Sequence, residues 1–383
     1  MSIHIEAYYS SLNKINEELC GDKIKITYCE DFFLMVLADG LGSGVKANIL
    51  ATLTSEILTT MIKEGASIDE AVDTITSTLP VCKERGIAYS TFIVLQVYND
   101  GRAYLVEYDN PQTLLLRDNK VVELNRKKIV KSNKVISEAY FNVKTNDFIV
   151  MYSDGIEFAG NHNILNLDWD CNEISNFLVS NIRRNDNAIK LCNKLINVVK
   201  SLYQDNIKDD STVAIAHVLP QRYLSLMIGA PKNKADDKKV VRNFLRLAGK
   251  KIVCGGTTSK IVARELSKDI VDIKNDGFAP TLSSIEGIDL VCEGVLTLNN
   301  VLMYLKKCNE SKDYYDQFIS ENNSQAAYLV CSMLLKATNI KIIIGMAKNF
   351  AHIDIGIENK FNIIEDIVKQ LTIIGKKVTL EKY

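Results

Sequence analysis

The chain has 383 residues, which is enough for two domains of ordinary size. Hydrophobic residues make up 47% and charged residues 24%, as in a soluble globular protein, and the formal net charge of −1 excludes the strongly basic balance typical of nucleic-acid or anionic-membrane binding. No apolar stretch of about 18 residues is free of charge, and the N-terminus lacks a basic segment followed by an apolar core. We therefore expect neither a transmembrane helix nor a secretory signal. The nine cysteines contain no Cys-x-x-Cys pair, which indicates reduced thiols and a cytoplasmic location.

Runs of apolar residues predict many strands in the first half of the chain. The predicted strands span residues 24–29, 32–39, 89–98, 102–109, 113–118, 121–125, 147–156 and 209–218. Helical spacing predicts helices over 45–64 and 172–204, and Ser67 followed by Glu70 predicts the capped start of another helix. The turn sequence Asn99–Gly101 predicts a hairpin. Strands and helices do not alternate strictly here, which favours antiparallel sheets with helices on their outer faces.

The pattern changes after Pro220, where strands and helices begin to alternate. Predicted strands span 222–230, 250–256, 287–294, 339–347 and 376–383, and predicted helices span 236–249, 258–267, 295–308, 323–337 and 362–375. Such alternation is typical of an α/β domain with a largely parallel sheet. We therefore expect an α/β protein of two domains, residues 1–219 and 220–383.

Four aspartates stand at the edges of predicted strands in the first half. They are Asp22 in CGDKI, Asp39 in LADGLGSG, Asp154 in MYSDGIE and Asp209 in KDDSTV. Acids that converge without cations repel one another, and a divalent cation relieves that repulsion. Ligand sets made only of oxygen favour Mg²⁺ or Mn²⁺. Asp210, beside Asp209, either joins the set or faces solvent.

The segment after Asp39 contains three glycines, at positions 40, 42 and 44. Such a loop fits the close approach of a ligand or a bend that only glycine tolerates. A dinucleotide loop needs a third glycine at another spacing, and a P-loop needs Gly-Lys-Ser/Thr; the segment has neither. A metal site remains, beside the plainer alternative that Asp39 caps the helix predicted over 45–64.

The motifs CGD, ADGLGSG, YSDG and DDSTV, in this order, resemble the metal-dependent protein phosphatases of the protein phosphatase 2C type. Among them, the chain is most similar to the phosphatase domain of stage II sporulation protein E. The resemblance spans about Cys20 to Val218 and includes AYSTF (Ala88–Phe92). One departure is that residues 133–147, NKVISEAYFNVKTND, lack the short Gly/Pro-containing segment that shapes the substrate side of the site in this family.

The resemblance implies an αββα sandwich with two metal ions between two antiparallel sheets. It assigns the metal site by motif position: Asp39 bridges both ions, Gly40 contributes its carbonyl oxygen through a water, Asp22 supports the second ion, and Asp154 and Asp209 hold the first. A hydroxide bridging the ions then hydrolyses phosphoserine or phosphothreonine without a covalent intermediate. The implied substrates are phosphoproteins, in signalling branches often small anti-sigma-factor antagonists. Homodimerisation can reposition the helices behind the metal site in this family.

The second half contains a loop of its own, between a predicted strand and a predicted helix. Gly255, Gly256, Thr257 and Thr258 could offer backbone amides and hydroxyls to an anion. The plainer alternative is a strand–helix turn with Thr or Ser as the helix cap. No family resemblance identifies this half, and an anion-sensing domain and a partner-docking module fit it equally well.

Together, these observations predict a cytoplasmic Mn²⁺- or Mg²⁺-dependent phosphoprotein serine/threonine phosphatase. The C-terminal α/β domain would regulate or target it. Two alternatives stay open. One is a signalling module that keeps the phosphatase fold without catalysis, and the other is a small-anion sensor that acts through the C-terminal domain.

Overall fold

The computed structural model describes residues 3–78, 90–131, 134–159, 169–183, 186–273, 282–321, 323–347 and 357–383. The chain forms two compact units, Met1–Pro220 and Gln221–Tyr383. Ala88 and Tyr89 of the AYSTF motif lie outside the described residues. Among the described helices, none combines the length and the apolar character needed to cross a bilayer.

Two antiparallel sheets form the first unit. One has six strands in the order β2 (Asp22–Tyr28), β3 (Phe32–Gly40), β4 (Ser90–Tyr98), β5 (Arg102–Tyr108), β9 (Lys134–Asn142) and β8 (Lys127–Lys131). The other has five, in the order β1 (Ile3–Leu12), β11 (Ser211–Pro220), β10 (Phe148–Tyr152), β6 (Leu114–Arg117) and β7 (Lys120–Val122). This architecture confirms the predicted pair of antiparallel sheets.

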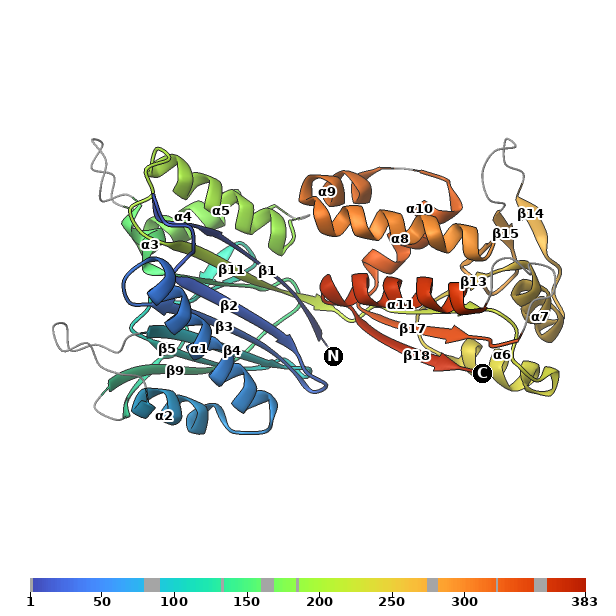
Figure 1. The fold of residues 1–383 in the computed structure, drawn as a ribbon, viewed down its shortest axis with the longest axis horizontal. Coiled ribbons are helices and arrows are strands. Elements are labelled where there is room, and N and C mark those ends of the chain that lie inside the picture. The colour runs from blue at the N-terminus through green and yellow to red at the C-terminus, as the bar shows by residue number, and fades with distance from the viewer. Residues whose placement is uncertain are drawn as a thin grey trace. The chain divides into compact units, whose positions relative to one another are not determined.

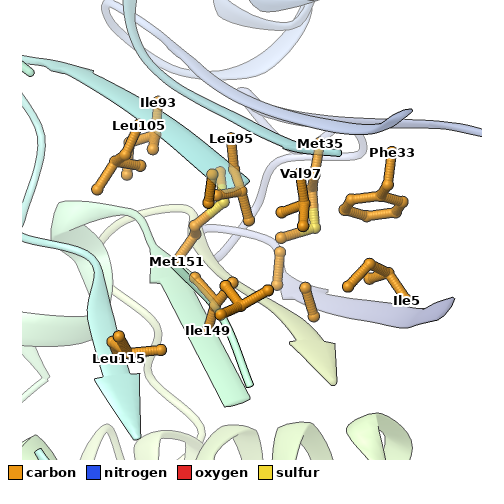
Figure 2. Close-up of a cluster of buried hydrophobic side chains, with 14 of the residues drawn as sticks. Ile5, Phe33, Met35, Ile93, Leu95, Val97, Leu105, Leu115, Ile149 and Met151 are labelled. Carbon is orange, nitrogen blue, oxygen red and sulfur yellow. The ribbon is translucent and has the colours of Figure 1, made fainter. Parts of the chain in front are cut away.

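The inner faces of the two sheets form one apolar core. Figure 2 shows Met35 and Leu95 of one sheet facing Ile149 and Met151 of the other. These four side chains are fully buried, and each such burial stabilises the fold by roughly 1.5–3 kcal/mol. The core therefore fixes how the two sheets stack, and with that stacking it brings their strand ends to a shared edge.

Helices cover the outer faces of this sandwich (Figure 1). On the six-stranded sheet they are α1 (Gly44–Lys63) and α2 (Ile68–Thr78), and on the five-stranded sheet α4 (Cys171–Asn181) and α5 (Ala188–Leu202). The predicted capping box at the start of α2 is confirmed: the Glu70 amide donates to the Ser67 hydroxyl at 3.1 Å and the Ser67 amide donates to the Glu70 carboxylate at 2.8 Å.

Four differences from the sequence expectations concern this unit. No element was expected over residues 3–12, where β1 pairs with β11 along its whole length. No strands were expected where β8 and β9 form the far edge of the six-stranded sheet. The single helical pattern over 172–204 is two helices, α4 and α5. The strand expected over 147–156 ends at Tyr152, and Asp154 begins the short helix α3 (Asp154–Phe158).

The second unit is built on one seven-stranded sheet. Its order is β14 (Val271–Ile273), β15 (Leu282–Ser284), β16 (Leu290–Cys292), β13 (Lys250–Cys254), β12 (Tyr223–Ile228), β17 (Asn339–Ile344) and β18 (Lys377–Lys382). The strands from β16 to β18 are parallel, and β14 and β15 are antiparallel additions. This confirms the expected α/β domain with a largely parallel sheet.

Helices lie on both faces of that sheet (Figure 1). A 3₁₀ turn (Lys234–Asp236) precedes α6 (Asp237–Arg246), which packs with α7 (Gly256–Leu266) against one face. The remaining helices are α8 (Val295–Glu310), α9 (Lys312–Ser320), α10 (Ala326–Lys336) and α11 (Ile357–Ile373). Among these, α9 was not expected from the sequence.

Candidate functional site

Five aspartates from both sheets of the first unit gather at one edge of the sandwich. We call Asp22, Asp39, Asp154, Asp209 and Asp210 the acid cluster. Asp22 begins β2 and Asp39 lies near the end of β3, whereas Asp154 follows β10 and the Asp209–Asp210 pair precedes β11. Antiparallel pairing places the start of one strand beside the end of its neighbour, so all these segments reach the same edge.

Asp22 and Asp39 face each other directly across the β2–β3 pair. Like charges in this position destabilise a sheet. Asp22 is only 5% exposed, and its Oδ2 accepts a hydrogen bond from the Ser153 hydroxyl at 2.7 Å. Its Oδ1 is buried and accepts no hydrogen bond from the described residues. Burial above all, together with Asp210 and Asp154, raises the pKa of Asp22 to about 7.

The carboxylate of Asp39 lies close to the other acids of the cluster. Burial first, and then the charges of Asp22, Asp154, Asp209 and Asp210, hold the pKa of Asp39 well above its ordinary value. Within the described residues, no ion pair joins Asp22, Asp39 or Asp154 to a lysine or arginine. The two lysines nearest in sequence to Asp39 and Asp209, Lys46 and Lys208, are exposed.

Asp154 lies at the first position of α3 rather than at the end of a strand. Burial and the neighbouring Asp209 raise the pKa of Asp154 to about 6. The following residue is glycine because the chains pack closely here: a Cβ on Gly155 would lie 2.1 Å from the carbonyl oxygen of Asp210. Tyr203, at the end of α5, donates its hydroxyl to the Gly155 carbonyl at 2.6 Å and holds this turn in place.

Gly40 is required for a similar reason. A Cβ on Gly40 would lie 2.0 Å from the backbone oxygen of Ala47 in α1, so only glycine lets the helix approach the end of β3. The glycine next to Asp39 thus serves packing within the protein itself, a reason that the sequence pattern did not reveal.

Asp210 has a structural environment of its own. It is 5% exposed, and its Oδ1 and Oδ2 accept the backbone amides of Lys14 at 3.0 Å and Gly21 at 2.9 Å. The neighbouring Asp209 is only partly buried, and its Oδ1 accepts the Asp210 amide at 3.0 Å. Of the two alternatives for Asp210, the solvent-facing one is therefore wrong.

The acid cluster fits a divalent cation in its chemistry. Its donors are all oxygens, Asp22 Oδ1 is buried without a partner, and the carboxylates repel one another. The side chains are not yet arranged as ligands, however. Among the described residues, no group of three or more His, Cys, Asp or Glu could hold a metal ion in the present conformation.

Comparison with known proteins identifies the first unit. The family model of stage II sporulation protein E (SpoIIE) matches residues 30–219. This part of the chain belongs to the SpoIIE family. Three members of the acid cluster that were assigned from the motifs, Asp39, Asp154 and Asp209, lie within the match, and Asp22 lies just before it. No curated protein matches the chain.

A solved structure shares the fold of the SpoIIE-like domain. The phosphatase domain of Bacillus subtilis SpoIIE with a fragment of its regulatory domain is 19% identical, with a TM-score of 0.50 over 57% of this chain and 64% of that chain. This chain therefore spans slightly less than two thirds of that structure. The B. subtilis phosphatase domain alone is 18% identical (TM-score 0.45, 57% of this chain and 93% of that chain). The RsbU and RsbW domains of a Mycobacterium tuberculosis protein are also 18% identical (TM-score 0.46, 64% and 68%).

The sequence reasoning missed Ser153 and the anchoring contacts of Asp210. Ser153 is fully buried; its hydroxyl donates to Asp22 and accepts the Thr212 amide at 2.9 Å, which links the two sheets beside the cluster. Its place directly before Asp154, in YSDG, is the only local signal. Nothing in a Ser-Asp pair reveals a partner 131 positions away.

The glycine loop of the second unit lies between β13 and α7. Gly255 has a φ of 101° and donates its amide to the Cys292 carbonyl at 2.8 Å. Gly256 and Thr257 are exposed, whereas Thr258 is buried and its hydroxyl accepts the Gly229 amide at 2.8 Å. The Thr258 hydroxyl is therefore used inside the fold. An anion site at this loop stays a prediction.

Proposed function

We propose that the SpoIIE-like domain is a phosphoprotein serine/threonine phosphatase that depends on two divalent cations, Mn²⁺ or Mg²⁺. The observation that supports this most strongly is the acid cluster itself. Four separate segments bring carboxylates to one edge, and Asp22, Asp39 and Asp154 have no lysine or arginine partner among the described residues. Such a site destabilises the fold unless a cation from outside neutralises it.

In this proposal Asp22, Asp39, Asp154 and Asp209 would hold the ions, together with the carbonyl oxygen of Gly40. When bound, the cations would supply Lewis-acid activation of water and offset the charge of the phosphoryl group. The protein positions the carboxylates. The β2–β3 register sets Asp22 opposite Asp39, and the Ser153 hydroxyl orients Asp22.

The substrate in this proposal is a phosphoserine or phosphothreonine on another protein, in the cytoplasm. A small anti-sigma-factor antagonist is the partner that the family suggests. The segment before the YSDG strand, which lacks the usual Gly/Pro-containing stretch, forms β9 and its exit. We therefore expect this chain to differ from other members of the family most in the part of the site that faces the substrate.

We also propose that two copies pair through α1. Its outer face carries Val45, Ile49, Leu53 and Ile57, which are 37–61% exposed and recur every fourth residue. An aliphatic stripe of this kind is self-complementary across a two-fold axis. Leu53→Glu should lower the mass measured by light scattering from dimer to monomer, whereas Val130→Glu, on the exposed strand β8, should leave it unchanged.

A second candidate function is a binding module that keeps the fold without catalysis. The observation in its favour is that the carboxylates, as they stand, are not arranged to hold a metal ion. In this case the domain would recognise a phosphoprotein or a partner and would not turn over phosphate.

The deciding experiment measures phosphate release from a phosphoserine peptide and from p-nitrophenyl phosphate. Wild type is compared with Asp39→Asn, and with Asp100→Asn as an exposed control, in Mn²⁺ and in chelator. Activity that needs Mn²⁺ and disappears only in Asp39→Asn would support the phosphatase. Tight Mn²⁺ binding in calorimetry without turnover on either substrate would favour the binding module. Absence of both would overturn the proposal.

A further inference from the structure

Segment 13–21, which we call the connector, runs from β1 in one sheet to β2 in the other. It ends directly before Asp22. On one side it is held by the chain that leads into β11: the Ile15 amide donates to the Ile207 carbonyl at 2.9 Å, and Asp210 accepts the amides of Lys14 and Gly21. The connector therefore places the first residue of β2.

The start of α1 holds the connector on its other side. The Ser43 hydroxyl donates to Glu17 Oε1 at 2.8 Å, and Asn48 Nδ2 donates to the Cys20 carbonyl at 2.7 Å. The side chains in these contacts are partly exposed, whereas Asp210 is only 5% exposed and its contact with the Gly21 amide is buried. Asp210 is therefore the most buried of these anchors.

We propose that Asp210 is a positioning residue that acts through the connector on Asp22, while the adjacent Asp209 contacts the metal directly. This rests on the proposed phosphatase function. An ionised carboxylate that accepts two backbone amides forms charge-assisted hydrogen bonds, stronger than neutral ones. Both Asp210 oxygens are engaged in this way, so its charge is directed at the connector. Gly21 also has to be small, because a Cβ there would lie 2.9 Å from Asp210 Oδ2.

Two neighbouring aspartates thus have separable effects. In Asp210→Asn one oxygen becomes an NH₂ group and faces a backbone N–H, so one anchor is lost and the connector loosens. Mn²⁺ affinity then falls by about tenfold or more, as it does when partners of metal ligands are removed, and saturating Mn²⁺ restores kcat. In Asp209→Asn a ligand itself is lost, and excess Mn²⁺ does not restore kcat.

The test uses the full chain without metal and measures hydrogen exchange at the Lys14 and Gly21 amides. Asp210→Asn should speed exchange at one or both of these amides by at least about tenfold, since an amide without its acceptor loses its protection. Asp209→Asn should leave both rates near wild type. Equal protection in wild type and Asp210→Asn, or equal loss in the two variants, would overturn the anchoring role.

Mn²⁺ titrations then separate this inference from the proposed function. If wild type binds no Mn²⁺ and shows no turnover, the phosphatase proposal fails, while the exchange rates still decide whether Asp210 anchors the connector. If Asp210→Asn does not fold, Glu17→Ala replaces it. This variant removes the acceptor of the Ser43 hydroxyl on the other side of the connector and should raise the Mn²⁺ dissociation constant in the same direction but less. An unchanged dissociation constant in Glu17→Ala would count against the connector as the route to Asp22.

Discussion

Buried acids in this protein occur in two contrasting settings. Glu107 and Asp147, in the body of the first unit, each receive an arginine: Arg126 Nε lies 2.8 Å from Glu107, and Arg117 Nη2 lies 2.6 Å from Asp147. In the acid cluster, by contrast, Asp22 and Asp39 face each other. The paired acids are satisfied within the fold. Asp22 and Asp39 have no such arginine or lysine among the described residues, and the proposed metal site rests on this contrast.

The largest expected effect comes from removing the arginine that pairs with a buried acid. The acid then lacks a cation, as Asp22 and Asp39 do among the described residues. Arg126 donates to Glu107 and to the Thr113 carbonyl, and its removal leaves the buried Glu107 without its cation, although the Thr113 amide still donates to it. Arg126→Met should lower the free energy of unfolding by roughly 3–5 kcal/mol. Urea unfolding followed by the fluorescence of Trp169, the single tryptophan, reports on this unit.

The matched control for that prediction is Arg102→Met, which removes an exposed ion pair with Asp100. Surface pairs contribute little, so this variant should stay within about 1 kcal/mol of wild type. If Arg126→Met lowered the free energy of unfolding by a similarly small amount, Glu107 would tolerate burial without its arginine. The lack of a cation at Asp22 and Asp39 would then no longer indicate a metal site.

The second prediction compares the stability of wild type and Asp39→Asn, first in chelator and then with Mn²⁺. In chelator, Asp39→Asn should be more stable than wild type by up to about 1 kcal/mol, because one of two facing charges is removed. With free Mn²⁺ at about 100 times its dissociation constant, wild type should gain about 2.7 kcal/mol, and Asp39→Asn far less. The same urea unfolding measures both. Equal stabilisation of the two proteins by Mn²⁺ would place the bound ion away from Asp39.

Local patterns were sufficient for the elements with strong periodicity or turn chemistry. Ser67 and Glu70 predicted the start of α2, and Asn99–Gly101 predicted the hairpin between β4 and β5, with Gly101 at a φ of 96°. Local patterns did not predict β1. Its residues have no regular burial pattern, and its partner β11 lies about two hundred positions away. Pairing at that distance leaves no mark in a local window.

In the candidate site, too, the local features could be predicted and the long-range contacts could not. The acids were recognisable as motifs, and the structure brings Asp22, Asp39, Asp154 and Asp209 to one edge. Their roles as ligands stay a prediction. The contacts that hold them there, from Ser153 and Asp210, join segments more than a hundred residues apart. Two adjacent aspartates look alike in sequence, and only the fold shows that Asp210 accepts the amides of Lys14 and Gly21 in the connector.

The third prediction concerns His217, a buried base without a partner for one nitrogen. Its ring stacks on Phe148 with centroids 3.9 Å apart, and its Nδ1 has no hydrogen-bond partner among the described residues. Burial lowers the pKa of His217 to about 4. The unfolded chain binds this proton first, so His217 costs no stability above its ordinary pKa of 6.5 and destabilises the fold as the pH falls toward 4.

This effect can be isolated with His217→Phe, which keeps the aromatic stack and removes the titration. Between pH 7.5 and 5, wild type should lose about 2 kcal/mol more than the variant. The acid cluster works in the opposite direction, because its raised pKa values favour the folded state as the pH falls. Both proteins share that contribution, so the difference between their pH profiles reports His217 alone. Parallel profiles would show that His217 binds its proton as readily in the folded protein as in the unfolded chain.

The smallest expected effect concerns a buried hydroxyl that, unlike the carboxylates of the acid cluster, carries no charge. Thr54 lies on the inner face of α1, fully buried, and its hydroxyl finds no partner among the described residues. Thr54→Val exchanges that hydroxyl for a methyl group of similar size and should stabilise the unit by roughly 1 kcal/mol. Thr74→Val, which removes a hydroxyl that donates to the Glu70 carbonyl at 2.8 Å, should be neutral or slightly destabilising. The free energy of unfolding in urea, with and without Mn²⁺, measures both variants.

Metal should leave the Thr54→Val gain unchanged, because an unpaired hydroxyl has no charge for a cation to neutralise. A gain that vanished in Mn²⁺ would instead tie Thr54 to the acid cluster and extend the site into α1.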